Sequence, residues 1–75
     1  MIQELDTVVL RHDIKEHGLK AGDIGAIVLC HREGGAFEVE FVSGEGETVA
    51  VLTLKREEVR LMHAQEILHA RELAA

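Results

Sequence analysis

The sequence lacks the cysteines that would stabilise a small secreted protein. Its 75 residues include one cysteine, Cys30, which excludes an intramolecular disulfide. Chains this short from oxidising compartments usually contain several cysteines. We therefore expect a cytoplasmic protein.

Long apolar runs are also missing. No run approaches the roughly 20 residues that cross a bilayer as a helix. The acidic start, residues 1–6, has neither the basic region nor the apolar region of a signal peptide. The sequence predicts neither export by this route nor insertion in a membrane.

Aromatic residues are scarce: the chain has no Trp, no Tyr and two Phe. A groove that binds proline-rich peptides needs Tyr and Trp, and RNA-binding barrels use aromatic side chains as stacking platforms. The two Phe residues are assigned to the core below. Both modes of recognition are therefore disfavoured.

Basic residues are outnumbered. The chain has eight Lys and Arg residues and fourteen Asp and Glu residues, which gives a formal net charge of -6. This balance repels a phosphate backbone unless the basic residues gather on one face. Binding to nucleic acid is thus unfavourable, and a basic protein is the favoured partner.

Glycines and β-branched residues predict a β-meander. All seven glycines lie between Gly18 and Gly46, and 47% of the residues are hydrophobic, enough for one core. Glycine-containing turns separate short apolar runs. The predicted strands cover residues 5–11, 24–31, 36–42 and 48–54, with a loop at 12–23 and turns at 32–35 and 43–47.

The strands differ in how many apolar faces they have. Alternation in residues 36–42 places Phe37 and Phe41 on one face and Glu38 and Glu40 on the other, which is typical of a half-solvated strand. The runs at 24–29 and 49–54 are apolar on both faces. Their second face needs a cover from barrel closure, the C-terminal segment or another chain, and on this ground we expect a dimer.

The end of the chain completes the predicted fold. Residues 55–58 suggest one helical turn and residues 59–62 a closing strand, so residues 1–62 form a small mainly β barrel of five strands. Residues 63–75 contain strong helix formers without Gly or Pro, which favours a helical extension of the same domain. A sixth strand over residues 67–73 is the alternative.

A short motif at the predicted barrel entry supports this fold. Gly18, Gly22, Asp23 and Gly25 stand in a G-x-x-x-G-D-x-G arrangement, in which glycines permit sharp turns and the Asp23 carboxylate can accept backbone hydrogen bonds. The motif resembles the entry to an SH3-like barrel of the KOW kind. Together with the runs at 4–10, 38–42 and 48–54, it is similar to the small bacterial family known as domain of unknown function 4926. The resemblance implies an SH3-like barrel and, through neighbouring genes that look like toxins, an antitoxin or immunity role.

The chemically reactive side chains do not form a recognisable catalytic motif. The spacings of the five histidines do not match a zinc site, and Cys30 ends an apolar run. Glu38 and Glu40 share a strand face at roughly 7 Å, but a surface strand supplies no glycosidase pocket. We therefore predict no catalytic residue, no metal and no cofactor. The five histidines are His12, His17, His31, His63 and His69.

The favoured function is a non-enzymatic protein-interaction module. Its predicted contact residues lie on one acidic hairpin, which would steer association with a basic partner: Glu38, Glu40, Glu45 and Glu47. One alternative is a KOW-like module associated with RNA or the ribosome, in which Lys15, Lys20 and Arg32 meet phosphate. Another is an accessory barrel subunit of an enzyme complex.

Overall fold

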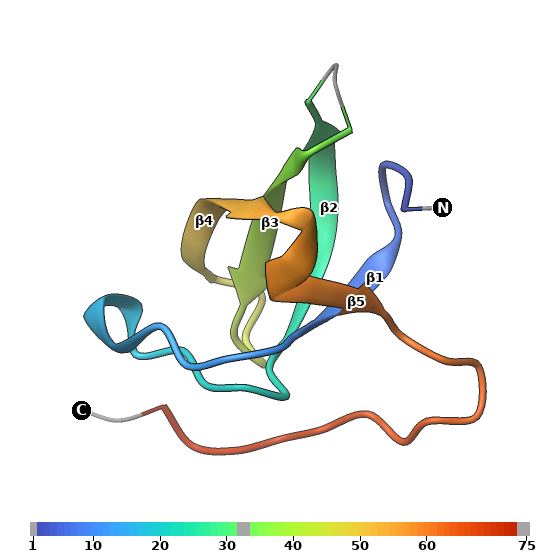
Figure 1. The fold of residues 1–75 in the computed structure, drawn as a ribbon. Helices are drawn as coiled ribbons and strands as arrows, with labels where there is room; N and C mark the ends of the chain where they lie inside the picture. The colour runs from blue at the N-terminus through green and yellow to red at the C-terminus, as the bar shows by residue number, and fades with distance from the viewer. Residues whose placement is uncertain (1, 32–33, 74–75) are drawn as a thin grey trace.

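The computed structural model describes residues 2–31 and 34–73 and contains a single antiparallel sheet (Figure 1). Its strands and 3-10 helices follow one another as β1 (Thr7–Leu10), η1 (Lys15–His17), β2 (Ile24–Cys30), β3 (Ala36–Val42), β4 (Thr48–Lys55), η2 (Arg56–Glu58) and β5 (Val59–Leu61). Each predicted strand is present, with ends that differ from the prediction by at most two residues. The mainly β fold class is confirmed.

The sheet has the strand order β4-β3-β2-β1-β5 and is not closed. β1 pairs with both β2 and β5, so the last strand returns beside the first. β4 and β5 are the two edges, and in the described part of the chain they do not pair with each other. The five predicted strands therefore form an open sheet rather than a complete barrel.

One face of the sheet forms the core. Alternate residues of β3 (Phe37, Val39 and Phe41) are at most 3% exposed, as period-2 patterning predicts. They pack with Val8 and Ile27, which are fully buried. The core thus joins the first strand to the central hairpins.

The opposite face of the sheet is not covered within the described residues. Val28, Leu29 and Val51 are 43%, 46% and 50% exposed. A register shift between Ile27 and Leu29 marks an irregularity in β2 at Val28. The second apolar face expected of β2 and β4 is therefore present and open to solvent.

The predicted turns differ in how far the structure describes them. Arg32 and Glu33 of the turn at 32–35 lie outside the described residues. In the β3–β4 turn, the Ser43 amide donates to the Glu47 carbonyl at 2.8 Å and Gly46 has φ of 84°. That positive φ is a conformation that glycine adopts readily.

The C-terminal prediction is wrong. Residues 63–73, called the C-terminal segment below, form neither the predicted helix nor the alternative strand, and Figure 1 shows them as an extended trace. Short isolated helices are marginal in water, so tertiary contacts decide the conformation. Here Arg60 binds Glu66 through two hydrogen bonds, at 2.9 and 2.7 Å, and Arg71 binds Asp23. Residues 74–75 lie outside the described part.

No helix in the described residues is long and apolar enough to cross a membrane.

Gly25 permits close approach of β2 to β3. A Cβ added at Gly25 would lie 2.7 Å from Val39 Cγ1 and 3.1 Å from the Glu40 carbonyl oxygen. We expect Gly25→Val to reduce the free energy of unfolding by about 2 kcal/mol or more, because overpacking forces strands apart. Urea denaturation followed by circular dichroism measures this change.

Gly44→Val is the matched control for this prediction. A Cβ added at Gly44 would meet open space, and the residue has no positive φ. A Gly25→Val protein as stable as Gly44→Val would show that the approach of β2 to β3 is not a constraint on the fold.

Candidate functional site

The exposed face of the sheet combines aliphatic side chains with carboxylates. Cross-strand pairing aligns Leu29 with Glu38 and Glu40 with Val51. Val42 extends the same face of β3 and is 54% exposed. We call Leu29, Glu38, Glu40, Val42 and Val51 the outer-face patch. It presents apolar area beside acidic groups on three adjacent strands.

Hydrogen bonds hold the two carboxylates of the patch in place. Glu38 Oε2 accepts from Thr53 Oγ1 and from His31 Nε2, both at 2.6 Å. These contacts lower the pKa of Glu38, with Thr53 as the larger cause. Glu40 Oε2 accepts from Thr48 Oγ1 at 2.6 Å. Both side chains therefore stay on the sheet surface in a defined orientation.

The other two predicted contact residues lie at the end of the hairpin. Glu45 and Glu47 are exposed in the β3–β4 turn, and their backbone amides each donate to Ser43 Oγ at 3.3 Å. The structure thus brings Glu38 and Glu40 together with apolar residues and leaves Glu45 and Glu47 in the adjoining turn.

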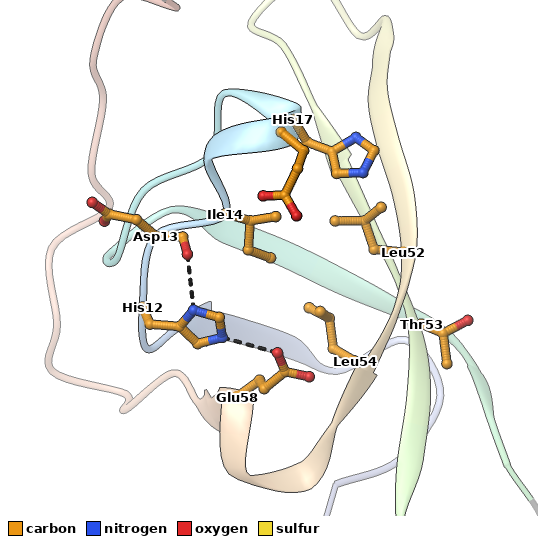
Figure 2. A pocket seen from close by; sticks show the side chains of 9 residues that line it. His12, Asp13, Ile14, His17, Leu52, Thr53, Leu54 and Glu58 are labelled. Atoms are coloured by element: carbon orange, nitrogen blue, oxygen red, sulfur yellow. Dashed lines mark hydrogen bonds and ion pairs between the residues drawn. The ribbon is translucent and has the colours of Figure 1, made fainter.

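A pocket of about 360 Å³ lies between residues 12–17 and β4 (Figure 2). Leu52 and Leu54 point across it toward Ile14, whereas Thr53 points away. Glu16 and Glu58 line its rim, whereas the Asp13 carboxylate points away from it and accepts from the Ala21 amide at 2.9 Å. We call this space the edge pocket because β4 is an edge strand. It has an apolar floor and a mixed polar rim, to which His12 and His17 also contribute.

His12 and Glu58 close one end of the edge pocket. His12 Nε2 lies 2.9 Å from Glu58 Oε2, and His12 Nδ1 lies 2.8 Å from the Asp13 carbonyl oxygen. Both ring nitrogens face acceptors, so only the doubly protonated imidazolium donates at both. The hydrogen bond to Glu58 is the largest cause that raises the pKa of His12.

The barrel-entry motif forms a compact anchor for the C-terminal segment. Gly18 and Gly22 have φ of 68° and 96°, and the Asp23 carboxylate accepts from the Lys20 amide at 2.8 Å. Arg71 donates to both Asp23 oxygens, at 2.8 and 2.6 Å, and His69 Nε2 lies 3.1 Å from Oδ1. The turn motif therefore binds a segment almost fifty residues away in sequence.

Asp23 is ionised because its hydrogen bonds outweigh its burial. The residue is 8% exposed, and burial alone would raise the pKa of its carboxyl. Donors from Arg71, the Lys20 amide and His69 lower the pKa to about 2. The Asp23 turn was predictable from the sequence, whereas its contacts with Arg71 and His69 were not, because only the fold brings these residues together.

The remaining reactive side chains are dispersed. Cys30 is a free, half-buried thiol whose Sγ lies 3.9 Å from the Ile2 carbonyl oxygen. Within residues 2–31 and 34–73, no three His, Cys, Asp or Glu side chains are grouped to hold a metal ion. Four of the five histidines lie against carboxylates, as His31 does against Glu38 and His63 against Glu66.

Comparison with known proteins assigns the chain to a family. The family model described as "Domain of unknown function (DUF4926)" matches residues 4–61. The chain therefore belongs to this family, and the match covers all five strands. Comparison with curated proteins and with solved structures gave no match.

Loss of the Arg71 contact should make the protein less resistant to acid. A carboxyl with a depressed pKa contributes stability above its unfolded value, near 3.8, and this stability is lost as the pH falls toward 2. We expect Arg71→Ala to raise the Asp23 pKa and move acid unfolding to higher pH. Carboxyl-detected NMR and a circular dichroism pH titration measure the two effects.

Arg11→Ala removes the same charge from an exposed position and is the control. Equal acid stability of the two variants would contradict the anchoring role of Asp23 and Arg71.

Neutralising Glu58 should lower the pKa of His12. A raised histidine pKa contributes stability below the unfolded value, near 6.5, which is lost as the pH rises through the folded value. We expect Glu58→Gln to lower the midpoint of the His12 ring titration, measured by NMR. Glu57→Gln removes the same charge at the adjacent residue and should leave the His12 midpoint unchanged. An equal shift of the midpoint in both variants would show that net charge, and not the Glu58 hydrogen bond, causes the effect.

Proposed function

We propose that this protein is a non-enzymatic interaction module that binds a basic protein through the outer-face patch. The observation that supports this proposal is the combination of exposed Leu29, Val42 and Val51 with the held carboxylates of Glu38 and Glu40. Contiguous exposed apolar area rimmed by polar groups is typical of protein interaction sites.

The geometry of the patch suits a protein partner. Aliphatic side chains supply area that gains free energy when water is excluded. Glu38 and Glu40 are already oriented by threonine hydroxyls, so less side-chain entropy is lost when a cation binds them. Lys or Arg beside an apolar centre is the complementary surface.

The charge of the chain favours the same class of partner. A net charge of -6 attracts basic proteins over long distances and accelerates association at low salt. An antitoxin or immunity protein that blocks a basic toxin is one form of this function. RNA is the weaker candidate because Glu38 and Glu40 would place carboxylates against phosphate.

Neutralising the patch should slow association. We expect Glu38→Gln with Glu40→Gln to lower the association rate several-fold at low salt, with little change in stability because glutamine oxygens still accept from the threonines. The same change at Glu45 and Glu47 should have a smaller effect. Surface plasmon resonance against the partner recovered by affinity capture measures these rates at two salt concentrations.

Glu4→Gln with Glu72→Gln is the charge-matched control, since both residues are exposed and outside the patch. If the variant with Glu38→Gln and Glu40→Gln associates at the wild-type rate in low salt, as this control should, the outer-face patch is not the contact. Sedimentation of the free chain separates this function from self-association through the same face.

A further inference from the structure

The C-terminal segment is held to the rest of the chain by its side chains. Within residues 2–31 and 34–73, no backbone–backbone hydrogen bond involves residues 67–73. Ile67, Leu68 and Leu73 are 92%, 69% and 50% exposed, so the segment also buries little apolar area. A segment with few main-chain hydrogen bonds and few buried apolar contacts opens at a low cost in free energy. Its side-chain contacts therefore decide whether it stays in place.

The contacts of residues 67–73 converge on one carboxylate. Arg71 donates from Nε to Asp23 Oδ1 at 2.8 Å and from Nη2 to Asp23 Oδ2 at 2.6 Å. Nη2 also donates to the Gly18 carbonyl oxygen at 2.8 Å, and His69 Nε2 lies 3.1 Å from Asp23 Oδ1. Paired hydrogen bonds to a carboxylate match the planar fork of a guanidinium group, which lysine does not reproduce. We call Asp23 and the Gly18 carbonyl the arginine receptor.

A cavity of about 750 Å³ lies beside the arginine receptor, between residues 68–73 and one end of the sheet. Apolar side chains of the sheet and of the loop before β2 line it: Leu19, Ile24, Phe41, Val42 and Val49. The cavity leaves room for apolar side chains next to a guanidinium group bound at Asp23. Val42 also belongs to the outer-face patch, so the cavity adjoins the surface that we propose for partner binding.

An empty arginine receptor is costly. Asp23 is 8% exposed, and a buried ionised carboxylate without a cation lacks the stabilisation that water would give it. Release of the C-terminal segment alone is therefore unfavourable, whereas release coupled to the entry of another guanidinium group restores the same hydrogen bonds. The segment then keeps one advantage, its covalent attachment, which acts as an effective concentration in the roughly millimolar range. A partner that also binds nearby offsets this advantage.

We propose that the arginine receptor binds an arginine side chain of the partner, and that Arg71 occupies it until the partner displaces the C-terminal segment. The partner's arginine donates to both Asp23 oxygens and to the Gly18 carbonyl, and apolar residues beside it enter the cavity. Simultaneous contact with the outer-face patch supplies the free energy that displaces the tethered segment. This inference rests on the proposed function, because it assumes a basic partner bound at that patch.

A synthetic peptide with the sequence of residues 68–73, capped at both ends, tests this exchange on the wild-type protein. We expect the peptide at millimolar concentration to displace Arg71, so that the Arg71 Nε–H resonance of isotope-labelled protein moves to the position of a free arginine. A peptide with citrulline in place of its arginine has nearly the same size without the charge, and should displace Arg71 at least about tenfold less effectively. A lysine peptide keeps the charge without the paired hydrogen bonds and should also be weaker.

Arg71→Lys weakens the internal occupant of the receptor while it keeps the charge of the C-terminal segment. We expect this variant to bind the arginine peptide about tenfold more tightly than the wild type does, because the competing side chain no longer makes paired hydrogen bonds to Asp23. Amide resonances of Leu19 and Ile24, in the cavity wall, report the binding. Arg11→Lys makes the same change at an exposed residue and should leave the affinity at the wild-type value.

The proposal is overturned by any of three results. The first is binding of the arginine peptide to the wild type while the Arg71 resonance stays in place. The second is equal binding of the arginine and citrulline peptides. The third is no binding of the arginine peptide to Arg71→Lys at millimolar concentration.

The outcomes also distinguish this inference from the proposed function. Slowed association of the captured partner with the Glu38 and Glu40 variant, without displacement of Arg71 by the arginine peptide, rejects the arginine receptor alone. Displacement of Arg71 by that peptide, together with a patch variant that associates at the wild-type rate, rejects the outer-face patch alone.

Discussion

The buried carboxylate of Asp23 is the contact on which the arrangement of loops depends. It binds the Lys20 amide within its own turn and Arg71 and His69 from the C-terminal segment. An unpaired ionised group at 8% exposure would be costly, so the turn and the segment stabilise each other. The Asp23 turn also ends the loop of residues 12–23, and this loop forms one wall of the edge pocket. One carboxylate thus links the C-terminal segment to the loop beside the edge pocket.

The strands were predictable because their signals are local. Period-2 alternation identified β3 with both ends correct, and glycine placement identified the entry to β2. Closure was not predictable in this way, because it depends on whether β4 and β5 meet across the core. The C-terminal helix failed for a related reason. Helix propensity in residues 63–75 is weak compared with the paired hydrogen bonds of Arg60 with Glu66 and of Arg71 with Asp23.

The candidate surfaces also combine features that local sequence patterns predict with features that only the fold creates. Alternation alone placed Glu38 and Glu40 on the face opposite the core, and the structure adds their threonine partners. The edge pocket joins residues 12–17 to β4 and η2, and its His12–Glu58 pair spans 46 positions in sequence. No spacing rule detects such a pair. A long run without charged residues or proline, residues 48–54 of β4, was visible in the sequence, but its place at the sheet edge was not.

Acidity explains how an exposed apolar face and a free strand edge can coexist in one small chain. Edge-to-edge contact between two copies would bring together two molecules of charge -6, and at low salt their repulsion extends over about 10 Å or more. A basic segment meets attraction at the same surface. On our proposal, the carboxylates of Glu38 and Glu40 act twice: they oppose pairing between copies and favour a cationic partner. On the same proposal, charge gives the outer-face patch its selectivity, and the aliphatic side chains supply the contact area.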